Sequence, residues 1–303
     1  MTERLRMGLV GAGPWAHLFT GPMLAASDDV EFVGIWSRRL EPATELATHH
    51  GVQAFAELDD LFAACDAVTF SVPPSVQAAL AARAAAAGLA VLLDKPVGGN
   101  LAEAEALAAA IDEARVTSQV ILTNRYFDSM RAFIAQAREF DSYGGRAAFF
   151  GDGCVPGTYF ATPWRVTEGG LLDLGPHVLD SLDAALGTIV RIKATGDPQR
   201  LVLLECEHDN GCISQAALSA TSKQDGGLIV EVHGPEGQLS LDVSAFSPEK
   251  SAAEFATAQR TILSEFAAAV RSGVSHELDV HRGLHLQRLI EDASRQLPSQ
   301  SQW

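Results

Sequence analysis

Short apolar runs alternate with alanine-rich stretches through the first 123 residues of this 303-residue chain. Stretches of helical composition include residues 75–87 and 101–115. The apolar runs cover residues 5–10, 31–37, 66–72, 89–94 and 118–123. Short runs of this kind are typical of buried strands, and their strict alternation with helices predicts a doubly wound α/β domain with a parallel sheet covered on both faces.

Beyond residue 123 the pattern changes to consecutive strands. Helices are predicted near 128–140 and 174–186, on either side of the segment GGRAAFFGD. Later apolar runs, split by turn signals such as DNG, DGG and GPEG, cover residues 189–195, 200–207, 212–220, 227–233 and 237–243. This order predicts an α+β domain with an open, mostly antiparallel sheet and helices on one face. We therefore expect two domains, 1–123 and 124–303, with a last helix about 276–296 as a candidate to pack back on the first.

Charge and composition narrow the classes of partner. The net charge of −16 argues against nucleic acid or an anionic membrane surface, because both require a basic footprint. No apolar run approaches the roughly 18–20 residues of a membrane-spanning helix, and the N-terminal apolar stretch is too short for a signal peptide, so we expect a cytoplasmic protein. The four cysteines lack CxxC spacing and are interpreted as reduced, mostly buried thiols rather than a disulfide or zinc site: Cys65, Cys154, Cys206 and Cys212.

The stretch GLVGAGPWA carries the first chemical motif. Gly11, Gly13 and Ala16 occupy the G-x-G-x-x-[GA] positions, with Pro14 and Trp15 between them, directly after a predicted strand and at the opening of a helix. In such a turn the first glycine permits the sharp bend, the second lets a pyrophosphate approach the backbone, and the third position keeps helix and strand close. The motif predicts dinucleotide binding, against the alternative of a glycine-rich turn without function.

The end of the second predicted strand bears on the choice between NAD and NADP. An acidic residue there would hold the ribose 2′-hydroxyl of NAD. The strand instead ends in Ser37, Arg38 and Arg39. A hydroxyl followed by a guanidinium suits a 2′-phosphate, so NADP is favoured and NAD is the second possibility. The alternative is a solvated basic turn that takes no part in cofactor binding.

A lysine stands where the run AVLLD leaves the sheet. Lys95 follows the strand and precedes Pro96, which cannot continue a ladder. Ligands of open α/β sheets bind outside the carboxyl ends of the strands. We therefore expect Lys95 to project towards the cofactor crevice rather than to be an ordinary surface lysine.

A third group of polar residues falls in GGLLDLGPHVLD. Because proline is tolerated in the first turn of a helix, Pro176 predicts a helix that starts near Asp173 or Leu174. Spacings of four and three residues then place Asp173, His177 and Asp180 on one helix face. A solvated polar face would have the same spacing, so the pattern alone leaves both interpretations open.

The chain resembles the Gfo/Idh/MocA oxidoreductase family in four stretches: GLVGAGPWA, SVPPSVQAALAARAAAAGLAVLLDKP, NRYF and WRVTEGGLLDLGPHVLD. The resemblance implies an N-terminal Rossmann domain and a C-terminal α/β domain whose open sheet often makes the oligomer contact, here a homodimer or homotetramer. Three positions depart from the family pattern. Asp94 replaces glutamate in E-K-P, Glu168 replaces the first glycine of GGG, and Gln77 stands where many members have histidine.

The resemblance also implies roles for particular residues. Lys95, Asp173 and His177 fall on the catalytic lysine, aspartate and histidine of the family. Val72 and Pro73 fall on a loop that lies against the cofactor. Two arginines are further candidates to touch the nicotinamide or the substrate, Arg125 at the end of a strand and Arg165 before the glycine pair, whereas Trp164 is expected in the core.

These residues together imply an NAD(P)-dependent oxidoreductase that prefers NADP and needs no metal. It would move hydride between the nicotinamide and a secondary alcohol or ketone of a sugar, cyclitol or similar polyol, with Lys95 or His177 as the base. Two other functions stay open on the same fold. One is a non-catalytic nucleotide-binding sensor or co-regulator, and the other is a glycosidase that oxidises its substrate transiently with bound NAD.

Overall fold

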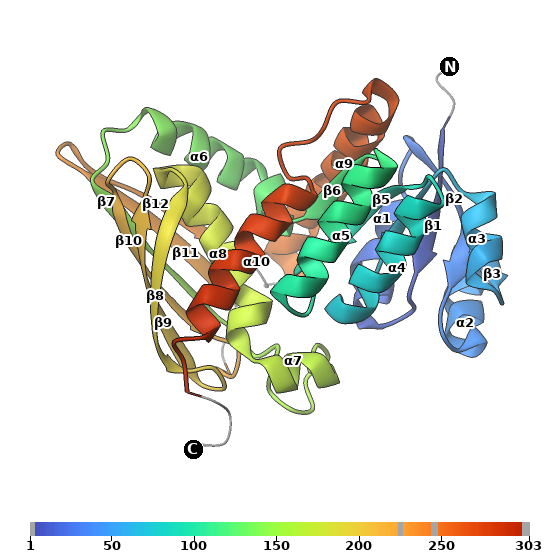
Figure 1. The fold of residues 1–303 in the computed structure, drawn as a ribbon, viewed down its shortest axis with the longest axis horizontal. Helices are drawn as coiled ribbons and strands as arrows, with labels where there is room; N and C mark the ends of the chain where they lie inside the picture. Colours follow the sequence, from blue (N-terminus) through green and yellow to red (C-terminus); the bar gives the residue numbers. More distant parts are fainter. Residues whose placement is uncertain (1–3, 224–226, 244–247, 299–303) are drawn as a thin grey trace. The chain divides into compact units, whose positions relative to one another are not determined.

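The computed structural model describes residues 4–223, 227–243 and 248–298, and Figure 1 shows its elements in order along the chain. The chain divides into two compact units. Unit 1 comprises Met1–Ile121 and Ala256–Gln287, and unit 2 comprises Leu122–Phe255 and Arg288–Trp303. Unit 1 thus includes a C-terminal segment that begins well before the helix expected at about 276–296.

A six-stranded parallel sheet forms the centre of unit 1, in the order β3-β2-β1-β4-β5-β6. Its strands are β1 (Leu5–Val10), β2 (Val30–Trp36), β3 (Gln53–Phe55), β4 (Ala67–Phe70), β5 (Ala90–Asp94) and β6 (Ser118–Ile121). The predicted doubly wound α/β domain is confirmed. The short strand β3 was not predicted, because three residues are too few to show an apolar pattern.

Helices connect the strands of this sheet. They are η1 (Ala16–Thr20), α1 (Gly21–Ala25), α2 (Leu40–His50), α3 (Leu58–Ala64), α4 (Pro74–Ala86) and α5 (Leu101–Ala114). Among them, α4 and α5 are rich in alanine. The alanines of α4 that face inward, such as Ala81 and Ala84, are completely buried. Asn100 caps α5, since its side chain accepts from the Glu103 N–H at 3.0 Å, and Glu103 accepts in return from the Gly99 N–H at 2.8 Å.

The C-terminal part of unit 1 lies along the edge strand β6. It consists of residues from α9 (Pro248–Ser272) and α10 (Val280–Ser294) and the segment between these helices. The Val120 N–H donates to the Leu278 carbonyl at 2.6 Å, and the Val280 N–H donates to the Ser118 hydroxyl at 3.1 Å. The segment between α9 and α10 thereby satisfies backbone groups at the edge of the sheet.

A second six-stranded sheet forms the centre of unit 2, in the order β12-β11-β7-β10-β9-β8. Only β7 and β10 pair in parallel; the other neighbours are antiparallel, as predicted. The strands are β7 (Gly144–Phe150), β8 (Ile189–Asp197), β9 (Leu201–His208), β10 (Ile213–Ser219), β11 (Gly227–Gly234) and β12 (Gly237–Val243). Side chains alternate across β9, with Val202 and Leu204 buried and Leu203 exposed, so the sheet has one covered and one open face.

The helices of unit 2 include η2 (Thr123–Tyr126), α6 (Asp128–Glu139), α7 (Pro163–Glu168) and α8 (Gly170–Leu186). Helix α8 packs on β7–β11 and covers the inner face of the sheet. It begins earlier than predicted, so Pro176 lies inside it. The prediction of a start near Asp173 or Leu174 was wrong, because burial of almost the whole helix compensates for the hydrogen bond that proline cannot donate.

All four cysteines are buried and unbridged, as expected. Burial raises the pKa of Cys65 and of Cys206 to about 12, which keeps both thiols protonated at neutral pH. In the described parts of the chain, no helix combines the length and the apolar character needed to cross a membrane.

Candidate functional site

The glycine-rich turn after β1 passes very close to the end of β4. Gly11 has φ +117°, and a Cβ on it would lie 2.3 Å from the Ser71 carbonyl oxygen. Only glycine fits this position. Gly13 is different: among the described residues, a Cβ on it would have within 4 Å only the Ser71 oxygen, at 3.9 Å. A backbone without a side chain and without close neighbours at this point fits the approach of a pyrophosphate.

The residues after the turn start the first helical segment. Pro14 and Trp15 are half-buried, and the Trp15 ring stacks on Phe19 with centroids 4.6 Å apart. Ala16 is completely buried, which is where the motif requires a small residue. The His17 N–H donates to the Gly13 carbonyl at 3.2 Å and closes the first turn.

The end of β2 carries a hydroxyl and two guanidinium groups. The Ser37 hydroxyl donates to the Arg39 carbonyl at 2.5 Å, which closes the turn before α2 begins at Leu40. The side chains of Arg38 and Arg39 are exposed. Gly11, Ser37 and Lys95 follow β1, β2 and β5, so they lie along the same carboxyl edge of the parallel sheet.

Lys95 directly follows β5 and is half-buried. Its backbone N–H donates to Asp94 Oδ1 at 2.8 Å, and its peptide bond to Pro96 is cis. The loop that includes Val72 and Pro73 follows the neighbouring strand β4 and leads into α4. The amide of Gln77, in the first turn of α4, bonds to the backbone of Asp94 and Pro96.

Asp173 is buried in the first turn of α8 and pairs with Arg165 of α7. Arg165 Nε donates to Asp173 Oδ1 at 3.1 Å. The Arg165 guanidinium also lies over the ring of Trp164, 4.6 Å from its centroid. Trp164 is half-buried, so the expectation of a core tryptophan was wrong: it supports the arginine that holds Asp173. Glu168 is exposed at the end of α7.

His177 lies one helical turn after Asp173. It is the one side chain of α8 that is not buried, and its ring centroid lies 6.0 Å from that of Phe149. Asp180 is 1% exposed. The alternative of a solvated polar face is therefore wrong for this helix, since its carboxylates are inside the protein.

Asp180 pairs with Arg125 rather than facing solvent. Arg125 Nη1 lies 3.1 and 3.2 Å from the two carboxylate oxygens of Asp180, and both side chains are almost fully buried. Arg125 lies in η2, not at the end of a strand as predicted. The ion pair joins η2 to α8, and no local pattern predicts it because its partners are 55 residues apart.

The site residues fall into two groups. Unit 1 carries the glycine turn, the Ser37–Arg38 turn and Lys95, and unit 2 carries Arg165, Asp173 and His177. Throughout the described residues, no group of three or more His, Cys, Asp or Glu side chains is arranged to hold a metal ion. The side chains named here supply an amine, an imidazole and a carboxylate that a guanidinium holds.

Comparison with known proteins identifies the family of the N-terminal part of the chain and the fold of the whole. Residues 5–122 match the family model described as "Oxidoreductase family, NAD-binding Rossmann fold". Trans-1,2-dihydrobenzene-1,2-diol dehydrogenase of Mus musculus is 30% identical over 200 residues, which make up 60% of this chain and 56% of the mouse protein. The match thus spans little more than half the length of that relative.

Two further proteins match over most of the chain. The dTDP-3,4-didehydro-2,6-dideoxy-alpha-D-glucose 3-reductase of Streptomyces violaceoruber is 29% identical over 80% of this chain and 74% of its own. The crystal structure of GenD2 from gentamicin A biosynthesis in complex with NAD has a TM-score of 0.84 and 24% identity, and covers 98% of this chain and 95% of that one. The latter likeness shows that the two chains share their fold.

Proposed function

This chain belongs to the Gfo/Idh/MocA oxidoreductase family, and we propose that it is an NAD(P)-dependent oxidoreductase acting on CH–OH groups. The substrate would be a secondary alcohol or ketone of a sugar, cyclitol or similar polyol. The observation that carries the proposal is the position of Lys95, at the same carboxyl edge of the sheet as the glycine turn. The mouse relative is named for a diol and the Streptomyces relative for a keto sugar, which supports this substrate class.

The residues present fit a nicotinamide dinucleotide. Gly13 leaves room for the pyrophosphate, and the loop of Val72 and Pro73 borders the same edge. When bound, the cofactor accepts or supplies the hydride. Lys95 is then the group that takes the hydroxyl proton during oxidation or returns it during reduction.

Two residues of α8 would complete the acid–base chemistry. His177 is the relay or the rival base, since its imidazole is the one side chain of the helix that is not buried. Asp173, which Arg165 holds at 3.1 Å, would orient the imidazole or a substrate hydroxyl. Arg165 contributes by fixing this carboxylate and not by proton transfer, because a guanidinium stays protonated.

NADP is the proposed preference. Its 2′-phosphate would meet the exposed Arg38 guanidinium beside Ser37 at the end of β2. Arg38→Glu is expected to lower kcat/KM for NADPH by about 10- to 100-fold, the effect of losing a charge-assisted hydrogen bond, and to spare the value for NADH. An equal loss with both cofactors, or a preference for NADH in the unaltered protein, would contradict the proposed preference.

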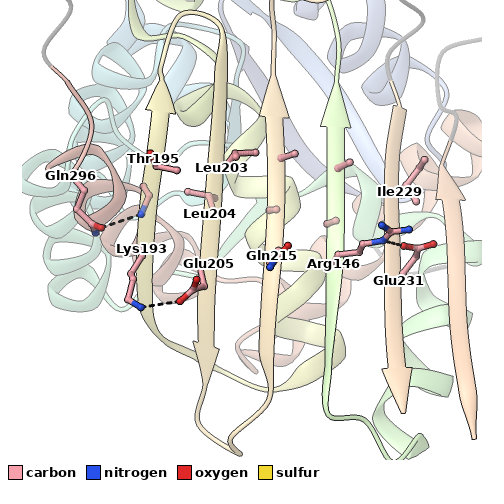
Figure 2. A pocket seen from close by; sticks show the side chains of 15 residues that line it. Arg146, Lys193, Thr195, Leu203, Leu204, Glu205, Gln215, Ile229, Glu231 and Gln296 are labelled. Carbon is pink, nitrogen blue, oxygen red and sulfur yellow. Dashed lines mark hydrogen bonds and ion pairs between the residues drawn. The ribbon is translucent and has the colours of Figure 1, made fainter. Parts of the chain in front are cut away.

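The proposed assembly is a homodimer, or a homotetramer built from it, through the open face of the sheet in unit 2. That face holds a shallow cavity of 840 Å³ whose lining residues come from the five neighbouring strands β8, β9, β10, β7 and β11, together with Gln296 (Figure 2). Leu203 and Ile229 are 44% and 42% exposed there. Such apolar exposure on a flat sheet is a feature of interfaces.

Nicotinamide absorbance tests the activity. Sugars, inositols and their oxidised forms are offered with NADP(H) and NAD(H) to the unaltered protein, to Lys95→Ala and to Lys223→Ala, the latter an exposed lysine as matched control. We expect turnover that Lys95→Ala lowers by roughly 10²- to 10⁴-fold, as for loss of a general base, and that Lys223→Ala retains. Nucleotide binding without turnover would favour the sensor, and substrate cleavage without net reduction would favour the glycosidase.

A further inference from the structure

Gln77 is a buried glutamine whose side-chain amide is fully used by the segment that carries Lys95. It is 1% exposed and lies in the first turn of α4. Nε2 donates to the Asp94 carbonyl at 2.8 Å and to the Pro96 carbonyl at 3.2 Å, and Oε1 accepts from the Asp94 N–H at 2.8 Å. Both N–H donors and the acceptor of the amide are therefore engaged with the chain on either side of Lys95.

The sheet ladder explains why a side chain is needed here. The pairing of β4 with β5 ends at Thr69 and Leu92, whereas the pairing of β5 with β6 continues to Asp94 and Ile121. On the side of β5 that faces β4, the ladder therefore ends before Asp94. The Gln77 amide takes the place of a strand peptide, because it both donates to and accepts from this one residue.

The backbone at Lys95 is held on both sides. Gln77 Nε2 bridges the carbonyls before and after Lys95, and the Lys95 N–H itself donates to Asp94 Oδ1. Since the backbone fixes the direction of the Cα–Cβ bond, these contacts determine where the lysine side chain starts. The Gln77 N–H also donates to the Pro73 carbonyl at 2.9 Å, so the same residue connects the Lys95 segment to the loop after β4.

We propose that Gln77 is a positioning residue for Lys95, which it keeps in the orientation needed for proton transfer. This inference rests on the proposed function of Lys95 as the acid–base group. Gln77 acts through the backbone and touches neither reactant. Asp94 contributes to the same arrangement, since its short side chain turns back to the Lys95 N–H.

The test compares Gln77→Met with Gln119→Met. Methionine is similar to glutamine in length and flexibility but forms none of these bonds. Gln119 is a matched control: it is completely buried in β6 of the same unit, and its Nε2 donates to a backbone carbonyl, that of Ile262, at 3.1 Å. Both variants are measured under conditions in which circular dichroism shows them folded. The readouts are kcat, KM, nucleotide Kd and amide hydrogen exchange of the peptide 92–97.

Gln77→Met is expected to lower kcat by roughly 10- to 100-fold, as for misplacement of a reacting group by about 1 Å, with nucleotide Kd unchanged. Exchange of the Asp94 amide should accelerate about tenfold, because its N–H loses its acceptor, Gln77 Oε1. Gln119→Met should change neither kcat nor the exchange of 92–97. Gln77→Glu should behave like Gln77→Met. Glutamate retains the acceptor for the Asp94 N–H, but it has an oxygen in place of Nε2, and this oxygen cannot donate to the Asp94 and Pro96 carbonyls.

Two results would overturn the proposal. One is unchanged exchange at 92–97 in Gln77→Met, and the other is accelerated exchange with an unchanged kcat. If the unaltered protein turns over no substrate, the proposed function fails separately. The acylation rate of Lys95 by an activated ester, with the modified peptide quantified by mass spectrometry, then replaces kcat: positioning predicts a changed rate in Gln77→Met alone, and equal rates in all variants would refute it.

Discussion

At the scale of single residues, the two glycines of the turn after β1 are required for different reasons. Gly11 is required by the fold, since its positive φ and the 2.3 Å distance from a built Cβ to the Ser71 oxygen exclude any side chain. Gly13 is not, because a Cβ there would make only an ordinary contact, 3.9 Å from the Ser71 oxygen. Its lack of a side chain has a purpose only if another molecule occupies the space beside it.

Alanine at each position separates these two requirements. Gly11→Ala is expected to destabilise the protein by about 2 kcal/mol or more, from backbone strain and from displacement of Ser71. Gly13→Ala should keep the melting temperature of the unaltered protein and raise the nucleotide Kd at least about tenfold. A tenfold change corresponds to the free energy that one hydrogen bond contributes. Thermal unfolding and a fluorescence titration with NADPH measure both. Normal nucleotide affinity in Gly13→Ala would remove the main argument for a pyrophosphate at this turn.

The ion pair of Arg125 and Asp180 is a second feature of this scale. Both side chains are almost fully buried, so removing the arginine takes a compensating charge away from a carboxylate inside unit 2. Arg125→Met should therefore cost about 3–5 kcal/mol, whereas the double variant Arg125→Met/Asp180→Leu should recover most of that loss. Denaturant unfolding of the three proteins gives the coupling free energy. Additive losses in the double variant would show that the pair is not the source of the stability.

At the scale of elements, α8 is stabilised by burial more than by its own sequence. Sixteen of its seventeen residues are buried, and it carries a Gly175–Pro176 pair in its interior. Proline cannot donate to the Leu172 carbonyl, its ring crowds that carbonyl, and it disfavours the helical conformation of the residue before it. Glycine at 175 reduces the last of these effects because it has no Cβ.

Replacing the proline tests this account. Pro176→Ala restores a backbone donor and removes the ring, but it also removes the packing contacts of the ring. We expect the free energy of unfolding to rise by about 1 kcal/mol as the net of these effects. The melting temperature should rise by about 2–4 °C. A fall of similar size would show that the buried ring contributes more through its contacts than it costs the helix.

The elements also show what a single sequence can predict. Apart from β3 and β7, the strands of both sheets were located to within a residue or two, because burial leaves an apolar run that is visible locally. Gly11 and Lys95 could be identified because a turn and a strand end define them. The start of α8 could not, since a local proline rule carries no information on packing, and the contacts of Gln77 with residues 94 and 96 join positions that no local pattern relates.

At the scale of the whole molecule, the chain crosses between its units more than once. Residues 256–287 return to unit 1, where the segment after α9 bonds to the edge strand β6. The sequence analysis expected one helix at about 276–296 as a candidate to pack back on the first domain, whereas the segment that belongs to unit 1 begins at residue 256 and ends at residue 287. The boundary expected near residue 124 marked the change from alternating to consecutive strands. This change in pattern does not predict that residues 256–287 belong to unit 1.

The open face of the unit 2 sheet carries its side chains in two rows across the strands. Paired positions give an apolar row, which runs through Thr195, Leu203, Ala217, Ala148 and Ile229. The neighbouring row is charged, and it runs through Lys193, Glu205, Gln215, Arg146 and Glu231. Within it, Lys193 pairs with Glu205 and Arg146 with Glu231, and the bond from Arg146 lowers the pKa of Glu231, which keeps that carboxylate ionised (Figure 2).

The order of charges in this row is positive, negative, neutral, positive, negative. A two-fold axis through the central Gln215 would place each charge opposite one of the other sign on a second copy, as a self-complementary dimer interface requires. Leu203→Glu is therefore expected to yield monomers by light scattering, while Val76→Glu, a change at a position of α4 that is 43% exposed, should leave the oligomer intact.

The position of the axis can be tested as well. A short bismaleimide should cross-link Gln215→Cys to its own copy, because a residue on a two-fold axis faces itself across sheets packed about 10 Å apart. Lys193→Cys, at the end of the row, should not cross-link to itself, since it would face Glu231 of the other copy. The buried native thiols should not react in either variant. Self-cross-linking at 193 in preference to 215 would place the axis elsewhere and contradict the charge argument.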